Sequence, residues 1–204
     1  IFKKGGIQIK RYPDHDLRRR MRLVNLLDIN TLFDIGANAG QYAIEMRNIG
    51  YSKRIISFEP LLSAFQILKK ASKKDCDWVV NNFGLGNVDN QIIINVSRNS
   101  ASSSILNLRP RTLSIAPLAE YIAQETIQIK KLDTIFNSLC IPRDNVMIKI
   151  DTQGYEKMVL EGATESLKKV RIIQLEMSLV PLYEDEMLFV DVINYLDNKG
   201  FQLF

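Results

Sequence analysis

Cysteine, histidine and long apolar runs are scarce in this chain of 204 residues. The two cysteines, Cys76 and Cys140, are far apart and lack the spacing of metal ligands, and the one histidine is His15. A chain of this size does not need a disulfide, so a reduced, cytoplasmic setting is predicted. No apolar run approaches the roughly 20 residues of a membrane-spanning helix, so no transmembrane segment is expected. No signal-peptide pattern is present, and because the sequence begins at Ile1 we expect a trimmed N-terminus.

The excess of basic charge is also small, since 27 Lys and Arg residues stand against 23 Asp and Glu residues, a net charge of +4. This balance permits an anionic substrate but lacks the dense basic patch of nucleic-acid-binding domains, so no nucleic acid is expected as a partner. With 46% hydrophobic residues, the chain can bury one sizeable core. We predict an N-terminal segment with a basic helix at 1–30 and one α/β domain at 31–204, truncated at its C-terminal end.

A glycine-containing turn follows the predicted strand over 31–35. There Gly36 and Gly40 mark a turn into a predicted helix over 39–48. Such a turn places backbone N–H groups and a helix N-terminus around a ligand. Glu59 ends the next apolar run, where Rossmann-type units hold the carboxylate that binds ribose hydroxyls. Together these features predict a nucleoside-binding βαβ unit.

Asp34, at the end of the strand before this turn, indicates which kind of nucleoside the turn binds. Pyrophosphate-binding turns usually read G-x-G-x-x-G, and a carboxylate beside the turn would repel the phosphates. The turn here reads Asp-x-Gly-x-Asn-x-Gly, with two glycines and an acid at the strand end. It favours S-adenosylmethionine, which carries a sulfonium and an ammonium and no phosphate, over a nicotinamide dinucleotide. A turn that only lets a helix pack closely on a strand is the alternative.

Alternating strand-like and helix-like segments predict a single α/β domain with a mostly parallel sheet and helices on both faces. The predicted strands lie at 31–35, 54–58, 78–81, 92–96, 126–130, 146–151, 171–177 and 200–204. The predicted helices lie at 16–27, 39–48, 60–73, 132–139, 152–160 and 186–199. Residues 1–15 are assigned no element. The polar loop 98–104 is either an exposed linker or a segment that folds over a pocket.

Lys149 and Asp151 close an apolar run that fits a central strand buried on both faces. In a strand these two side chains share a face, and a lysine inside an apolar strand needs a partner. Asp151 ends the strand, where open α/β sheets bind ligands, although a helix N-cap is an alternative role. Glu176 closes the following predicted strand in the same way.

These motifs resemble the FkbM family of S-adenosylmethionine-dependent methyltransferases. The resemblance covers roughly residues 30–180 and rests on Glu176 and on the motifs at 33–41, 58–60, 82–86, 102–104, 131–133, 149–156 and 161–163. It implies a seven-stranded, Rossmann-like class I methyltransferase fold and methyl transfer to a hydroxyl, often on a sugar or a polyketide-type acceptor. Many members have Val-Glu where this chain has Thr152-Gln153, so a carboxylate at position 153 is absent. The final antiparallel hairpin of the sheet also looks incomplete.

The resemblance implies a set of site residues, and the mechanism that we predict assigns them roles. The methionine end of S-adenosylmethionine would lie against Asp34, Gly36, Asn38 and Gly40, the ribose against Glu59, and the adenine against Asn82 and Gly84. The matched motifs add Gln41, Pro60 and Ser103 to the cofactor set. Methyl transfer removes a proton from the acceptor hydroxyl, so a base is expected beside it. Asp151, oriented by Lys149, is the first choice and Glu176 the second.

Three alternatives stay open from the sequence. Asp151 and Glu176 could share Mg²⁺ through oxygen ligands, but two carboxylates on neighbouring strands are more often hydrogen-bonded partners, so no metal ligand is assigned. A nicotinamide-dependent oxidoreductase is the rival within the same fold. A non-catalytic module that binds anions or nucleic acid through the basic helix is the rival from another class. The expected partner is a small, hydroxylated, sugar-like acceptor, and the composition indicates neither its identity nor the oligomeric state.

Overall fold

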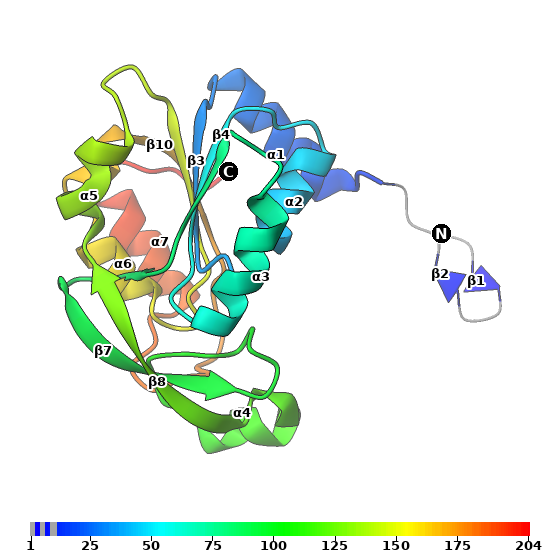
Figure 1. Cartoon of the computed structure of the whole chain (residues 1–204), viewed down its shortest axis with the longest axis vertical. Coiled ribbons are helices and arrows are strands. Elements are labelled where there is room, and N and C mark those ends of the chain that lie inside the picture. The colour runs from blue at the N-terminus through cyan, green and yellow to red at the C-terminus, as the bar shows by residue number, and fades with distance from the viewer. Residues whose placement is uncertain (1–2, 5–6, 9–11) are drawn as a thin grey trace.

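A five-stranded parallel sheet forms the centre of the computed structural model, which describes residues 3–4, 7–8 and 12–204 (Figure 1). The strand order is β10–β9–β3–β4–β5, and all four pairings are parallel. The strands are β3 (Thr31–Ile35), β4 (Arg54–Phe58), β5 (Trp78–Asn81), β9 (Val146–Ile150) and β10 (Val170–Leu175). The chain proceeds outward from β3 to β5 and then returns beside β3 as β9. This reversal creates a topological switch point, where such sheets bind ligands.

Helices cover both faces of the sheet, as the sequence predicted (Figure 1). Because side chains alternate along a strand, Leu32 of β3 packs on one face and Phe33 on the other. The Leu32 face is covered by α1 (His15–Leu26), α2 (Gln41–Asn48) and α3 (Leu62–Ser72). The Phe33 face is covered by α5 (Leu132–Leu139), α6 (Glu156–Glu161) and α7 (Phe189–Asp197). The predicted Rossmann-like architecture is confirmed.

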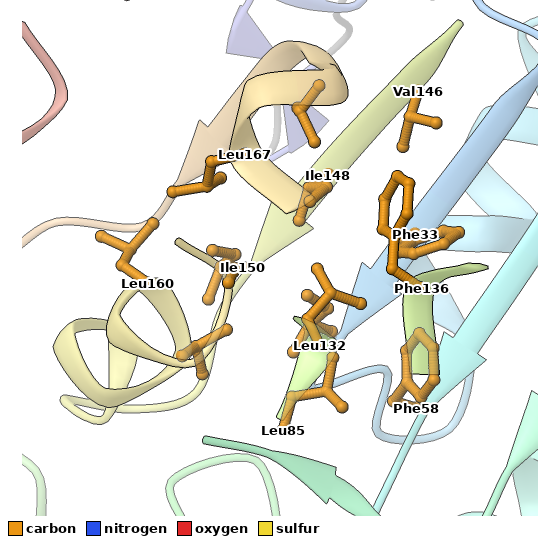
Figure 2. Close-up of a cluster of buried hydrophobic side chains, with 14 of the residues drawn as sticks. Phe33, Phe58, Leu85, Leu132, Phe136, Val146, Ile148, Ile150, Leu160 and Leu167 are labelled. Atoms are coloured by element: carbon orange, nitrogen blue, oxygen red, sulfur yellow. The ribbon is translucent and has the colours of Figure 1, made fainter. Parts of the chain in front are cut away.

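The larger hydrophobic cluster lies on the Phe33 face. Figure 2 shows Phe33, Ile148 and Leu160, which come from β3, β9 and α6, among the side chains of this cluster. Every residue of β3 and of β9 is buried, which explains their nearly continuous apolar sequence. Burial of each large apolar side chain contributes roughly 1.5–3 kcal/mol, so this cluster fixes the two strands that end at the switch point.

A second sheet stands beside the first and has the order β6–β8–β7. Its strands are β6 (Gly84–Leu85), β7 (Asn90–Ser97) and β8 (Tyr121–Lys130), and it packs on the N-terminal end of α3 through Ile94, Ile127 and Ile129. Between β7 and β8 lie α4 (Pro110–Ile115) and a 3₁₀ turn, η1 (Pro117–Ala119). A further 3₁₀ turn, η2 (Ser166–Lys169), precedes β10.

Several boundaries differ from the predictions. The strand predicted at 200–204 is absent, and in the described residues the main sheet has five strands rather than the seven that the resemblance implies. Leu203 and Phe204 are mostly exposed, with no neighbouring strand to accept their backbone hydrogen bonds. The segment 1–15 is not without structure, because β1 (Lys3–Lys4) and β2 (Ile7–Gln8) pair; residues 1–2, 5–6 and 9–11 lie outside the described residues.

Five helices also begin elsewhere than predicted. Helix α2 begins at Gln41 rather than 39, α3 at Leu62 rather than 60, and α6 at Glu156 rather than 152. Helix α1 begins at His15 because the Asp14 carboxylate caps it, accepting the Leu17 N–H at 2.9 Å. Helix α7 begins at Phe189 rather than 186. Among the residues that the structure describes, no helix is long and apolar enough to span a membrane.

Candidate active site

A cavity of about 570 Å³ opens at the carboxyl ends of β3, β4, β9 and β10. It therefore lies at the switch point of the sheet. Ten of the predicted site residues line it: Gly36, Asn38, Gln41, Glu59, Pro60, Gly84, Ser103, Lys149, Asp151 and Glu176. Three others, Asp34, Gly40 and Asn82, do not. The topology thus gathers residues that are more than 100 positions apart in the sequence.

The turn after β3 is shaped by its neighbours. Gly36 has a φ of +75°, and a Cβ added there would collide with the backbone carbonyl of Asp151, so only glycine fits. The N–H groups of Gly36 and Ala37 both donate to the Phe58 carbonyl, at 3.1 and 3.0 Å. These contacts hold the ends of β3, β4 and β9 together and form the floor of the cavity.

Glu59 is a buried carboxylate at this floor. Its Oε2 accepts the Asn38 N–H at 2.8 Å, and its Oε1 accepts the Leu61 N–H at 2.9 Å. Burial raises the pKa of Glu59 to about 7, although both backbone N–H groups oppose the shift. Each oxygen retains a lone pair for a further donor. The carboxylate is therefore rigidly held and able to accept hydrogen bonds from a ligand in the cavity.

Asp34 lies behind the cavity wall rather than in it. It is fully buried, and in register it pairs with Ser57 of β4 and Lys149 of β9. Its Oδ1 lies 3.3 Å from the Lys149 ammonium, and its Oδ2 accepts the Ser57 hydroxyl at 3.3 Å. The prediction that Asp34 contacts the cofactor directly therefore needs correction. Asp34 sits within the sheet, where the adjacent strands cover it, and its partner Lys149 lines the cavity.

Lys149 joins two carboxylates and the glycine turn. Its ammonium lies 3.3 Å from Asp34, 3.4 Å from Asp151 Oδ2 and 3.2 Å from the Gly36 carbonyl, to which it donates. Burial lowers the pKa of Lys149, but the two carboxylates outweigh burial and raise it above its ordinary value. The expected partner of this strand lysine is thus a pair of acids, and the three side chains carry a net charge of −1 when all are ionised.

Asp151 and Glu176 lie side by side at the open end of the cavity, because Ile150 of β9 and Leu175 of β10 are paired in register. Gln153 lies between them, with its Nε2 donating to Asp151 Oδ1 at 2.8 Å and lying 3.5 Å from Glu176 Oε2. The charge of Asp151, together with partial burial, raises the pKa of Glu176 to about 7. The Glu176 carboxyl therefore titrates near neutral pH beside Asp151.

A family model described as the methyltransferase FkbM domain matches residues 34–203. This chain belongs to the FkbM methyltransferase family. A curated relative, named hexuronic acid methyltransferase AglP and found in Haloferax volcanii, is 25% identical over 169 residues. The match takes in 79% of this chain and 63% of that relative. The chain thus spans less than two thirds of the length of the relative that it matches.

Other predicted site residues of this FkbM-family protein have structural partners. Ser100 to Ser103 line the cavity, so the polar loop folds over the pocket. The Ser103 hydroxyl accepts the Ser97 N–H at 3.0 Å and thereby holds that loop. The Asn82 amide donates to the carbonyls of Glu59 and Pro60, both at 3.0 Å, and so braces the segment that carries Glu59. A Cβ at Gly40 would contact the Trp78 ring. The predicted roles of these residues toward a cofactor stay predictions.

Sequence reasoning missed two side chains that α2 brings to the FkbM-family cavity, Tyr42 and Glu45. The usable signal was helical spacing, because Glu45 lies one turn after the predicted Gln41 and therefore shares its side of the helix. The sequence assigns no role to Gln153, and it leaves Tyr155 as either a residue that stacks on the acceptor or a surface residue; both line the cavity. Over the described part of the chain, no three His, Cys, Asp or Glu side chains lie close enough to hold a metal ion.

Proposed function

We propose that this protein is an S-adenosylmethionine-dependent O-methyltransferase that acts on a hydroxyl of a sugar-like acceptor. The observation that carries the proposal is the Glu59 carboxylate, buried and fixed by two backbone N–H groups at the floor of the cavity. A carboxylate at the end of the second strand of a βαβ unit suits the two hydroxyls of a ribose. Membership of the FkbM methyltransferase family supports the same reading.

The residues around Glu59 fit this cofactor. The Gly36 turn brings backbone close to the cavity, while Asn38 and Gln41 add polar groups beside it. When all three groups are ionised, the cluster of Asp34, Lys149 and Asp151 has a net negative charge, which favours a cationic ligand over a diphosphate. When bound, S-adenosylmethionine supplies an electrophilic methyl group on its sulfonium. The charge that disfavours a dinucleotide diphosphate therefore comes from the whole cluster rather than from Asp34 alone.

Asp151 and Glu176 would receive the acceptor. Lys149 and Gln153 each hold one oxygen of Asp151, so this carboxylate has a fixed direction and can accept a hydrogen bond from the acceptor hydroxyl. The hydroxyl proton would pass to the pair formed by Asp151 and Glu176. The pKa of Glu176, about 7, matches that of a base that works near neutral pH. Most of the rate gain would come from holding the two reactants in line and from excluding water.

The acceptor class rests on chemistry and on one comparison. Two carboxylates and an amide at the open end of the cavity can bind several hydroxyls at once, as a sugar presents them. The relative in Haloferax volcanii is named for methyl transfer to a hexuronic acid, which is a sugar acid. A sugar-like acceptor is therefore our proposal for this chain.

Separate calorimetric titrations with S-adenosylmethionine and with NADH test the cofactor. We expect one-to-one binding of S-adenosylmethionine; binding of NADH alone would favour an oxidoreductase. A screen of hydroxylated acceptors, monitored by release of S-adenosylhomocysteine, then tests the reaction. If the protein instead bound anionic polymers with a steep salt dependence and released no product, the non-catalytic module would be the better account.

A further inference from the structure

Gln153 is held from two sides by segments distant in sequence. The Ser104 hydroxyl donates to its backbone carbonyl at 2.6 Å, and the Tyr183 hydroxyl donates to its side-chain Oε1 at 2.9 Å. Its backbone has a φ of +56°, in the left-handed region, and the next residue, Gly154, has a φ of +94°. The Tyr183 ring packs so closely on Gly154 that a Cβ there would meet it at 2.9 Å. The strained backbone and its contacts thus hold Gln153 in one conformation.

The direction of the Gln153 amide follows from these partners. Because Oε1 accepts from Tyr183, the NH₂ group faces the two carboxylates, which can only accept when ionised. The amide therefore donates to Asp151 and reaches toward Glu176 without adding charge. A glutamate at this position would instead place a third acid between the other two and could not donate.

We propose that Gln153 is a positioning residue that holds Asp151 and Glu176 in their working arrangement and ties them to the loops that carry Ser104 and Tyr183. This inference rests on the proposed function, because it deepens the role of the same acid pair. The neutral amide at position 153 bridges the two carboxylates and adds no third negative charge at the acceptor end of the cavity.

A glutamine-to-glutamate change is the sharpest perturbation, since it preserves shape while removing the donor. The charged and titratable groups that face Glu176 are Asp151, Lys149, Glu156 and Tyr183. Adding an acid at position 153 raises the negative charge around Glu176, so its pKa should rise by about one unit. The matched control is Gln91→Glu, which makes the same change at an exposed position on β7.

The first test needs no acceptor. Carboxyl carbons of ¹³C-labelled protein are titrated by NMR, and the Glu176 signal is assigned from its loss in Glu176→Gln. We expect Gln153→Glu to raise the Glu176 midpoint by about one pH unit and Gln91→Glu to leave it unchanged. Equal midpoints in Gln153→Glu and wild type would overturn the proposal. If Gln153→Glu does not fold, Tyr183→Phe serves instead, because it removes only the hydroxyl that orients the Gln153 amide. The Glu176 midpoint should then rise by less than the one pH unit expected for Gln153→Glu.

The second test uses any acceptor that the screen provides. Gln153→Glu should lower kcat at least tenfold while the Kd for S-adenosylhomocysteine stays within twofold of wild type. A kcat within twofold of wild type, or a parallel loss of cofactor affinity, would contradict a positioning role. Failure to methylate any acceptor would count against the proposed function, whereas the NMR result would still decide whether Gln153 couples the two acids.

Discussion

Glu59→Gln is the substitution that isolates the role of charge in cofactor binding. The glutamine keeps the size of the side chain, and its carbonyl can accept one of the two N–H groups, from Asn38 or Leu61, that the carboxylate accepts. Its NH₂ group then faces the other N–H, which loses its partner. The variant thus removes the negative charge and one acceptor from the floor of the cavity and leaves the fold otherwise intact.

The magnitude follows from the pKa of about 7 that burial gives Glu59. Above pH 7 the wild-type carboxylate is ionised, and hydrogen bonds to a charged group contribute about 1.5–3 kcal/mol, so the variant should bind S-adenosylmethionine roughly 10- to 150-fold more weakly. Below pH 7 the wild-type side chain becomes protonated, and its affinity should fall by up to about tenfold per pH unit. The two proteins should therefore converge near pH 5.5.

Isothermal titration of S-adenosylmethionine between pH 5.5 and 8.5 measures this difference, with Glu165→Gln, an exposed glutamate far from the cavity, as the charge-matched control. The wild type and the control should gain affinity as pH rises through 7, and Glu59→Gln should not. Parallel curves for all three proteins, or equal affinity of Glu59→Gln and wild type at pH 8.5, would refute the assignment of Glu59 to the ribose.

Four more outcomes are expected. The pKa of Glu59 in the folded protein lies above its ordinary value of 4.5, so the free protein should lose up to about 3 kcal/mol of unfolding free energy as pH rises from 4.5 to 7. Glu59→Gln should not show this loss. Urea melts in which the two proteins depend on pH in the same way would contradict this expectation. Asp151→Asn should lower turnover by about 10²–10⁴-fold with unchanged cofactor affinity, and equal turnover would remove Asp151 from the acid pair. Lys149→Met leaves Asp34 buried without its cation and should cost about 3–5 kcal/mol in urea unfolding, so a loss below 1 kcal/mol would argue against the ion pair. Activity should persist after dialysis against a chelator; loss that Mg²⁺ restores would establish a metal.

The sequence predicted the features that depend on apolar runs and on the residues that directly follow them. The apolar run that contains Lys149 indicated a central strand, and the cost of burying an ammonium required a partner for it, which the structure supplies. Glu59 and Gly36 were predicted from their places after strands, because parallel strands bring their carboxyl ends to one edge.

The remaining features depend on register and on long-range pairing. The Asp34 carboxylate lies level with Ser57 and Lys149 in neighbouring strands, and no local pattern reveals that these strands cover it. The orientation of Gln153 is fixed by Tyr183, 30 residues away, from a loop without periodicity. At the chain end, 200–204 has the composition of a strand, but a strand forms only where a neighbour accepts its hydrogen bonds.

The most direct test of this account is a pair of crystal structures, one grown with S-adenosylhomocysteine and one with NADH. We expect the adenosyl group in the cavity with its ribose hydroxyls on Glu59, and no ordered dinucleotide in the second crystal. A dinucleotide diphosphate seated over Gly36, with no density for S-adenosylhomocysteine, would contradict the account.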